Sequence, residues 1–271
     1  MNDRGWRSEI AAAAVVLAVL LAAAVYADER SATPPSSAEL AAITLRGRAL
    51  AEYDQAAWHA TDAVQMANPK TAEGEHSLAK KENGKWRVVY GALNADKSKF
   101  LIGYEAMQSA KPREFSVVKN DPAVPDDGFY LFAARALELA RKDFGKVSRP
   151  MSSAVLAAPA NRLYVYLYPA PEKAGVFPVG GDVRYLISPD GQEIVEKREL
   201  HKSIVESQKN SRKGSKAAAA NHVHVQSDLP EDTDVFSVLE QDPPSPAIIG
   251  TRHFVFEIST DGSITIRKTK K

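Results

Sequence analysis

Residues 161–200 read NRLYVYLYPAPEKAGVFPVGGDVRYLISPDGQEIVEKREL, and this stretch decides the fold class. In LYVYLY (163–168), leucine and valine alternate with tyrosine, so both faces are largely apolar, as in a central strand. Two further strand-like runs, DVRYLIS and EIVEKREL, flank Asp190-Gly191, a dipeptide that favours a tight hairpin turn. The stretch therefore predicts antiparallel sheet built from hairpins.

The same hairpin signal recurs at Asn83-Gly84 and at Asp261-Gly262, each between alternating or β-branched residues. Residues 110–128, rich in proline and aspartate, predict a loop. Three other segments show helical spacing of their apolar residues. Together these patterns predict an α+β fold of antiparallel sheets with two or three packed helices, after an N-terminal signal or anchor helix. The predicted helices cover residues 39–67, capped by Ser36 or Ser37 and stopped by Asn68-Pro69, residues 128–145, and residues 232–241.

The N-terminus predicts export. After Arg4 and Arg7, residues 10–27 are apolar (IAAAAVVLAVLLAAAVYA) and end at Ala27, a small residue that suits signal-peptide cleavage. This run is also just long enough to span a bilayer as a helix. We therefore expect residues 1–27 to be a signal peptide or a membrane anchor. The rest of the chain is then extracytoplasmic: periplasmic, secreted, or tethered to the inner membrane.

Composition indicates a globular protein and excludes several kinds of partner. The chain has 271 residues and a formal net charge of +1, so no overall field attracts nucleic acid. It contains no cysteine, which excludes a disulfide-linked partner and thiolate metal ligands. Residues 28–38, with a Pro-Pro pair, predict a linker. Residues 39–158 then form a predicted N-terminal α+β part, and residues 159–271 a β-rich C-terminal part that carries a His-x-His segment.

That segment is the chemical lead in the sequence. His222 and His224 are two positions apart in HVHV, so on a strand both imidazoles point the same way. Asp234, at the start of a predicted helix, can return to them across a short loop. Two imidazoles and a carboxylate are a zinc ligand set that leaves a fourth position for water. His201 and His253 are further candidate ligands, because four of the six histidines fall between these two positions.

At these residues the sequence resembles the JAMM/MPN zinc metallopeptidases, whose signature is an upstream Glu, then His-x-His-Pro, then a Ser three residues before an Asp. The resemblance covers about 45 residues and implies that His222, His224 and Asp234 bind zinc, with an upstream Glu as general base. Val225 stands in place of the signature Pro, and Glu231 in place of the Ser. The candidate bases are Glu193, Glu196 and Glu199, with Glu172 further upstream.

A second resemblance, over residues 160–267, is to uncharacterised exported bacterial α+β proteins, and it implies a secreted fold without a known activity. Two functions follow as hypotheses. The first is an exported periplasmic or envelope protein that acts as a binding or accessory domain. The alternative is a zinc-dependent hydrolase of the JAMM kind, which cuts peptide or isopeptide bonds using His222, His224 and Asp234.

Overall fold

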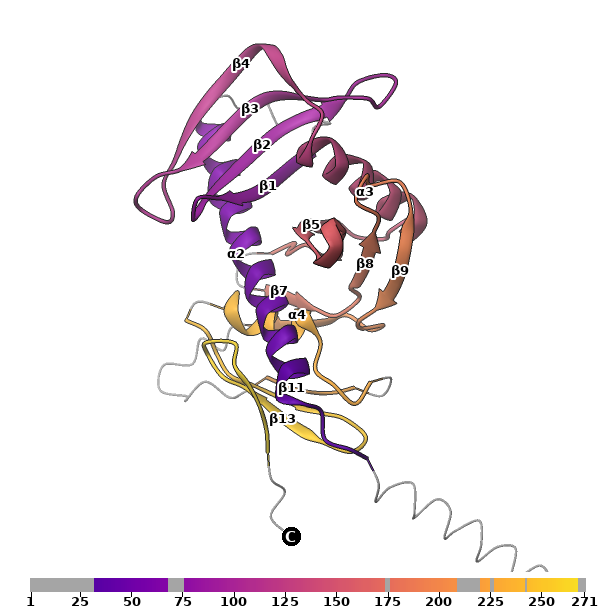
Figure 1. The fold of residues 1–271 in the computed structure, drawn as a ribbon. Coiled ribbons are helices and arrows are strands. Elements are labelled where there is room, and N and C mark those ends of the chain that lie inside the picture. Colours follow the sequence, from indigo (N-terminus) through magenta and orange to yellow (C-terminus); the bar gives the residue numbers. More distant parts are fainter. Residues whose placement is uncertain are drawn as a thin grey trace, which may run out of the picture.

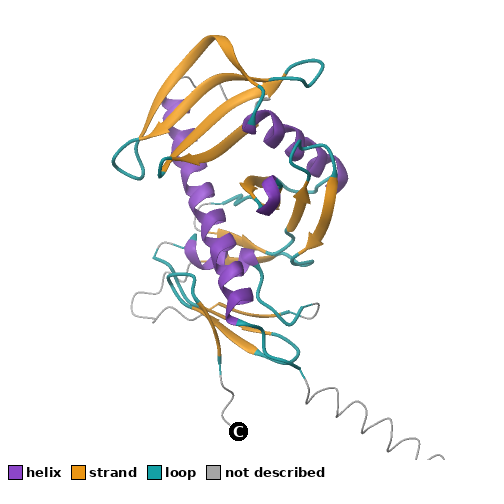
Figure 2. Cartoon of the chain, in the orientation of Figure 1, coloured by secondary structure: helices purple, strands orange, loops and turns teal. Residues whose placement is uncertain are grey.

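The structure is a computed structural model that describes residues 32–67, 76–173, 176–208, 220–224, 227–241 and 243–267. Within these ranges the chain is α+β, with three α-helices and mostly antiparallel sheets, as the sequence predicts (Figures 1 and 2). No helix in the described ranges has the length and apolar character needed to cross a membrane. The apolar run at 10–27 lies outside the described residues, so the signal peptide or anchor stays a prediction.

Helix α2 (Ser37–Ala67) is the long element that joins the two ends of the fold. It begins inside the predicted linker, after five described non-helical residues, and ends directly before Asn68-Pro69. The Ser36 hydroxyl accepts a hydrogen bond from the backbone N–H of Glu39 (3.2 Å), and the Glu39 carboxylate accepts one from the backbone N–H of Ser36 (2.8 Å). This reciprocal capping box fixes where the helix starts. In Figure 1, α2 runs from the C-terminal strands to the first sheet.

The first sheet is a four-stranded antiparallel meander. Asn83 and Gly84 have φ values of 51° and 78°, as a two-residue hairpin turn requires, which confirms that predicted turn. The apolar face of the sheet covers one side of α2, where the hydroxyl of Tyr53 accepts a hydrogen bond from the N–H of Ala79. The strands, in spatial order, are β1 (His76–Glu82), β2 (Lys85–Leu93), β3 (Phe100–Gln108) and β4 (Phe115–Asp126).

The loop predicted over residues 110–128 is wrong for most of its length, because β4 occupies Phe115–Asp126. The strand pairs with β3 alone, so it lies at an edge of the sheet. Proline lacks a backbone N–H and is tolerated on an edge strand, where one row of donors is not needed. Pro122 and Pro125 therefore mark an edge strand here and not a break in the sheet.

The central sheet has the order β5-β6-β8-β9 and packs against helix α3. The apolar segment predicted as a central strand is β6, which pairs with β5 on one side and β8 on the other. The predicted boundary at residue 158 falls between β5 and β6, two paired strands. Helix α3 ends at Gly145, whose N–H bonds to the carbonyl of Arg141. The bounds are α3 (Phe129–Phe144), β5 (Met151–Ala157), β6 (Leu163–Pro169), β8 (Val183–Ile187) and β9 (Ile194–Glu199).

Strands β7 and β10 pair as a separate two-stranded sheet. Helix α4 and the sheet of order β11-β12-β13-β14 form a small C-terminal unit against the N-terminal half of α2. One strand pair in it is parallel, β11 with β12, which departs from the purely antiparallel prediction. Helix α4 crosses α2 at Gly47, where an added Cβ would lie 2.5 Å from the backbone oxygen of Asp232. The elements are β7 (Val176–Val179), β10 (Val205–Gln208), β11 (Ala220–Val223), α4 (Asp232–Leu239), β12 (Ala247–Gly250), β13 (Val255–Ile258) and β14 (Ile264–Ile266).

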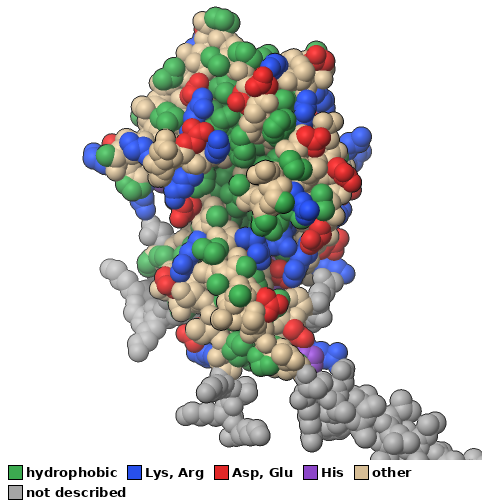
Figure 3. All heavy atoms as spheres, viewed as in Figure 1, with side chains coloured by type: hydrophobic (Ala, Val, Ile, Leu, Met, Phe, Trp, Pro, Cys, Tyr) green, Lys and Arg blue, Asp and Glu red, His purple; other side chains and the backbone are tan. Residues whose placement is uncertain are grey.

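The surface mixes charges of both signs. On the face drawn in Figure 3, lysine and arginine side chains alternate with aspartate and glutamate around apolar patches. This distribution agrees with the formal net charge of +1.

Candidate metal centre

Two loops of the central sheet approach each other closely and supply one side of the centre. Gly180 and Gly181 precede β8 with φ values of 90° and 67°, a left-handed conformation that favours glycine. An added Cβ on Gly180 would lie 2.1 Å from the backbone oxygen of Ser203, so a larger residue would separate the loops. The turn brings Asp182, at the start of β8, beside His201, which follows β9.

The C-terminal unit supplies the other side. His222 lies on β11, and His224 directly follows that strand, so the two side chains share a face as predicted. The Nε2 atoms of these two residues are 3.0 Å apart. Asp234, in the first turn of α4, places its Oδ1 atom 2.8 Å from Nε2 of His222. The three residues predicted as metal ligands are therefore brought together.

His201 completes the group. Its Nε2 atom lies 3.0 Å from Nε2 of His224 and 3.2 Å from Oδ1 of Asp234. The four ligand atoms of His201, His222, His224 and Asp234 all lie within 4.8 Å of one another. Zinc bonds of about 2.0–2.1 Å at tetrahedral angles place neighbouring ligand atoms about 3.3 Å apart. The observed spacings of 3.0 and 3.2 Å come close to that value.

The Nδ1 atoms of His201 and His224 already take part in hydrogen bonds, and these bonds direct the two Nε2 atoms at a common point. Nδ1 of His224 donates to the backbone carbonyl of Leu229 (3.0 Å). Nδ1 of His201 donates to Oδ1 of Asp182 (2.8 Å). In a neutral imidazole the other ring nitrogen, Nε2, then carries an unprotonated lone pair. Two lone pairs 3.0 Å apart repel each other unless a cation lies between them.

Asp234 shows the same need for a cation. Its side chain is fully buried, and Oδ2 accepts a hydrogen bond from the N–H of Glu231 (2.7 Å). Oδ1 makes close contacts with His201 and His222 but satisfies hydrogen-bond geometry with no group in the described residues. His201 and His222 thus both direct a ring nitrogen at Oδ1, an arrangement compatible with ligands of a shared metal ion.

The protonation behaviour of the group reflects this arrangement. Burial favours the uncharged forms, but the facing carboxylates outweigh it and raise the pKa of His201 to about 10, and that of His224 above its usual value. Burial would likewise raise the pKa of Asp234, yet the three imidazoles hold it well below its usual range. Without a metal, protons supply the positive charge that the buried carboxylate requires.

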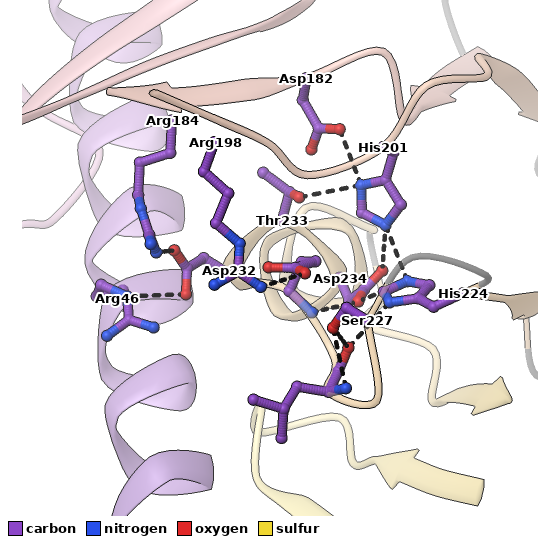
Figure 4. A network of polar contacts seen from close by, with 12 residues as sticks. Arg46, Asp182, Arg184, Arg198, His201, His224, Ser227, Asp232, Thr233 and Asp234 are labelled. Carbon is purple, nitrogen blue, oxygen red and sulfur yellow. Dashed lines mark hydrogen bonds and ion pairs between the residues drawn. The ribbon is translucent and has the colours of Figure 1, made fainter. Parts of the chain in front are cut away.

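The N-terminus of α4, which carries Asp234, is held by arginines from three elements (Figure 4). Asp232 is fully buried and accepts hydrogen bonds from Arg46 on α2 (2.8 Å) and Arg184 on β8. The hydroxyl of Tyr166 donates to the same carboxylate (2.9 Å). Glu231, which stands where the resemblance has a Ser, accepts a hydrogen bond from Arg198 (2.7 Å). These ion pairs fix the helix end to both α2 and the central sheet.

Other predicted site residues do not join the group. His253 pairs with Asp228 instead (2.7 Å between Nδ1 and Oδ2). The candidate bases Glu193, Glu196 and Glu199 are exposed on or beside β9, and none belongs to the group. The carboxylate closest behind the histidines is Asp182, which the sequence analysis did not single out. The signal for it was the Gly-Gly-Asp turn directly before a strand.

The centre opens into a pocket of about 480 Å³. His222 has the most accessible side chain of the group at 28 %, against 5 % for His224. All three histidines line the pocket, so a ligand in it can reach the centre. Its other walls are mainly apolar and come from β6, β7, the start of β10 and α4: Tyr168, Pro169, Phe177, Pro178, Val179, Val205 and Phe236.

Comparisons with protein-family models, curated proteins and solved structures found no match for this chain. The two resemblances drawn from the sequence therefore stay predictions.

Proposed function

We propose that this protein is an exported zinc-binding protein whose metal centre forms one end of a pocket that binds a peptide. The observation that carries the proposal is the convergence of four ligand atoms from His201, His222, His224 and Asp234 within 4.8 Å. Zinc suits this set because imidazole nitrogen and carboxylate oxygen are its usual ligands outside thiolate sites.

The outer contacts of the ligands support the proposal. Metal-binding histidines commonly donate their second N–H to a carboxylate or a backbone carbonyl, which fixes the tautomer. Here Asp182 and the carbonyl of Leu229 accept these two bonds. Solvated histidines on an exposed strand would not require these two hydrogen bonds to protein acceptors.

The number of ligands favours binding over catalysis as the primary role. Catalytic zinc sites usually have three protein ligands and an open position, whereas four protein ligands complete a tetrahedron. His201 supplies that fourth ligand. The described residues of the group also include no glutamate that could serve as a base.

A zinc-dependent hydrolase of peptide or isopeptide bonds is the second candidate, and the accessibility of His222 favours it. A ligand side chain that is 28 % exposed at the wall of a pocket allows the coordination shell to expand toward a substrate. When bound, zinc would polarise a carbonyl oxygen as a Lewis acid. In such a hydrolase the pocket would hold the peptide beside the metal centre.

Metal analysis of protein purified from expression of the full chain tests the proposal. We expect one zinc ion per chain in the wild type and a trace in the His222→Ala/His224→Ala double variant. Equal, substoichiometric zinc in both would exclude the site. A peptidase assay on zinc-loaded protein then separates the two roles, since turnover that chelators abolish and zinc restores would make the hydrolase the primary function.

Export is tested separately by cell fractionation and intact mass. A periplasmic or secreted form that begins at Asp28 indicates cleavage after Ala27, and a full-length form in the membrane fraction indicates an anchor. A full-length form in the soluble cytoplasmic fraction would contradict export.

A further inference from the structure

The pocket beside the candidate metal centre has a second polar feature, at the end of α4 away from the histidines. Asp54 on α2 and Glu240, which caps α4, both line it. The hydroxyl of Tyr168 donates to Asp54, and the side-chain amide of Gln55 donates to Glu240 (2.9 Å). The second carboxyl oxygen of Glu240, Oε1, is buried and has no hydrogen-bond partner among the described residues.

These two carboxyl groups lack a positive partner among the residues that the structure describes. The groups that act on Glu240 are Asp54 and Gln55, and the group that bonds Asp54 is Tyr168, so no described lysine or arginine neutralises either. Burial, together with the charge of Asp54, raises the pKa of Glu240 to about 8, and burial raises the pKa of Asp54. A buried carboxyl pair of this kind is stabilised by a cation that enters from outside.

The walls between the two polar ends suit an aliphatic stem. Tyr168, Phe177, Val179 and Phe236 line the pocket, and apolar walls of this kind accommodate methylene groups. Lys202 also lines the pocket, but its side chain is exposed. A ligand that combines an apolar stem with a cationic tip therefore matches both the walls and the acidic end.

The length of α4 sets the distance between the metal centre and the acidic end of the pocket. Asp234 lies in its first turn and Glu240 at its C-terminal cap, so the two are about 9 Å apart along the axis at the rise of an α-helix. The lysine side chain carries its ammonium on a flexible four-carbon stem. A peptide whose backbone lies beside the histidines can thus direct a lysine side chain along the pocket toward Glu240.

We propose that the pocket is a binding subsite for a lysine side chain of a peptide ligand, with Glu240 and Asp54 as the residues that select the ammonium group. The inference rests on the proposed function only for the placement of the peptide backbone at the metal. The selection itself belongs to the pocket and can be measured without metal.

The test compares capped tripeptides that differ at the middle residue, with lysine, norleucine or glutamate, by calorimetry on the full chain. Norleucine keeps the stem and lacks the ammonium. We expect the lysine peptide to bind about tenfold more tightly than the norleucine peptide, the scale of a charge-assisted hydrogen bond. The glutamate peptide should bind most weakly, since it places like charge beside Asp54.

Two isosteric variants, Glu240→Gln and Asp54→Asn, should each reduce the lysine preference to about threefold or less, with folding checked by circular dichroism. The matched control Glu114→Gln removes an exposed charge at the β3–β4 turn and should leave the preference unchanged. Equal binding of lysine and norleucine peptides by the wild type would overturn the subsite, as would full lysine preference in both variants. Absence of zinc with lysine preference retained would reject the metal centre and keep the subsite.

Discussion

Asp182 and His201 form a carboxylate–imidazole pair, with Nδ1 of the histidine 2.8 Å from Oδ1 of the aspartate. The two residues lie at the two ends of the β8–β9 hairpin, so the hairpin itself sets their distance. The pair holds Nε2 of His201 toward Asp234. A carboxylate in this position orients the imidazole and makes it a better ligand.

Asp182→Asn should therefore weaken zinc binding by roughly 10–100-fold, the usual cost of losing an outer partner of a ligand. Competition with a chromophoric chelator measures the affinity. Asp143→Asn is the matched control, because Asp143 contacts Tyr185 and Lys197 and lies outside the metal group. Equal affinity of Asp182→Asn and wild type would show that the Asp182 carboxylate does not strengthen His201 as a ligand.

The stability of the metal-free protein should depend on pH through His201. Its folded pKa, raised from 6.5 to about 10, lies above the unfolded value. The imidazolium contribution is thus fully present below pH 6.5 and is lost as the pH rises toward 10. Urea unfolding should show a stability difference between wild type and His201→Gln that shrinks over this range. A difference that stays constant or grows with pH contradicts the paired imidazolium.

Asp232→Asn should destabilise the protein by about 3–5 kcal/mol, because it leaves the Arg184 guanidinium buried without its carboxylate. The free energy of unfolding from urea titration gives the effect. Asp261→Asn removes an exposed pair with Arg48 and should cost less than about 1 kcal/mol. Similar effects for the two variants would mean that the Asp232 network does not anchor α4.

Gly47→Ala should destabilise the protein, although the same change in an ordinary helix stabilises it. The added Cβ would lie 2.5 Å from both the carbonyl oxygen of Asp232 and the Cβ of Val235, so α4 has to move. We expect a loss of about 1–3 kcal/mol, as in an overpacked core. Zinc affinity should fall with it, since α4 carries Asp234. A gain in thermal stability would mean that the two helices have room to separate.

Local patterns predicted most of the secondary structure because each depends on neighbouring residues. The turn at Asn83-Gly84, the end of α3 at Gly145 and the central position of β6 all follow from such signals. β4 was missed because its prolines are compatible with a strand only at a sheet edge, and edge position is a property of the whole sheet.

The residues of the candidate site also fall into two groups, those that local patterns predict and those that depend on the tertiary structure. His222, His224 and Asp234 were found because strand period and helix start are local. The roles of His201 and His253 could not be separated from sequence, since both were only candidates near the motif. The approach of the loops at Gly180 and Ser203 brings His201 to the group, whereas Asp228 holds His253 elsewhere.

The histidine ligands of the candidate centre lie on or beside strands of two separate sheets, and this gives a bound ion a mechanical role. His201 and His224 are 23 positions apart in the chain, so zinc would close a loop between the central sheet and β11. In a chain without cysteine, such a cross-link takes the place of a disulfide, and a loop of this span constrains the unfolded chain by roughly 3 kcal/mol in the entropy model. Proteolysis of the segment between the two histidines should therefore depend on zinc availability, which would make the lifetime of the protein responsive to the metal.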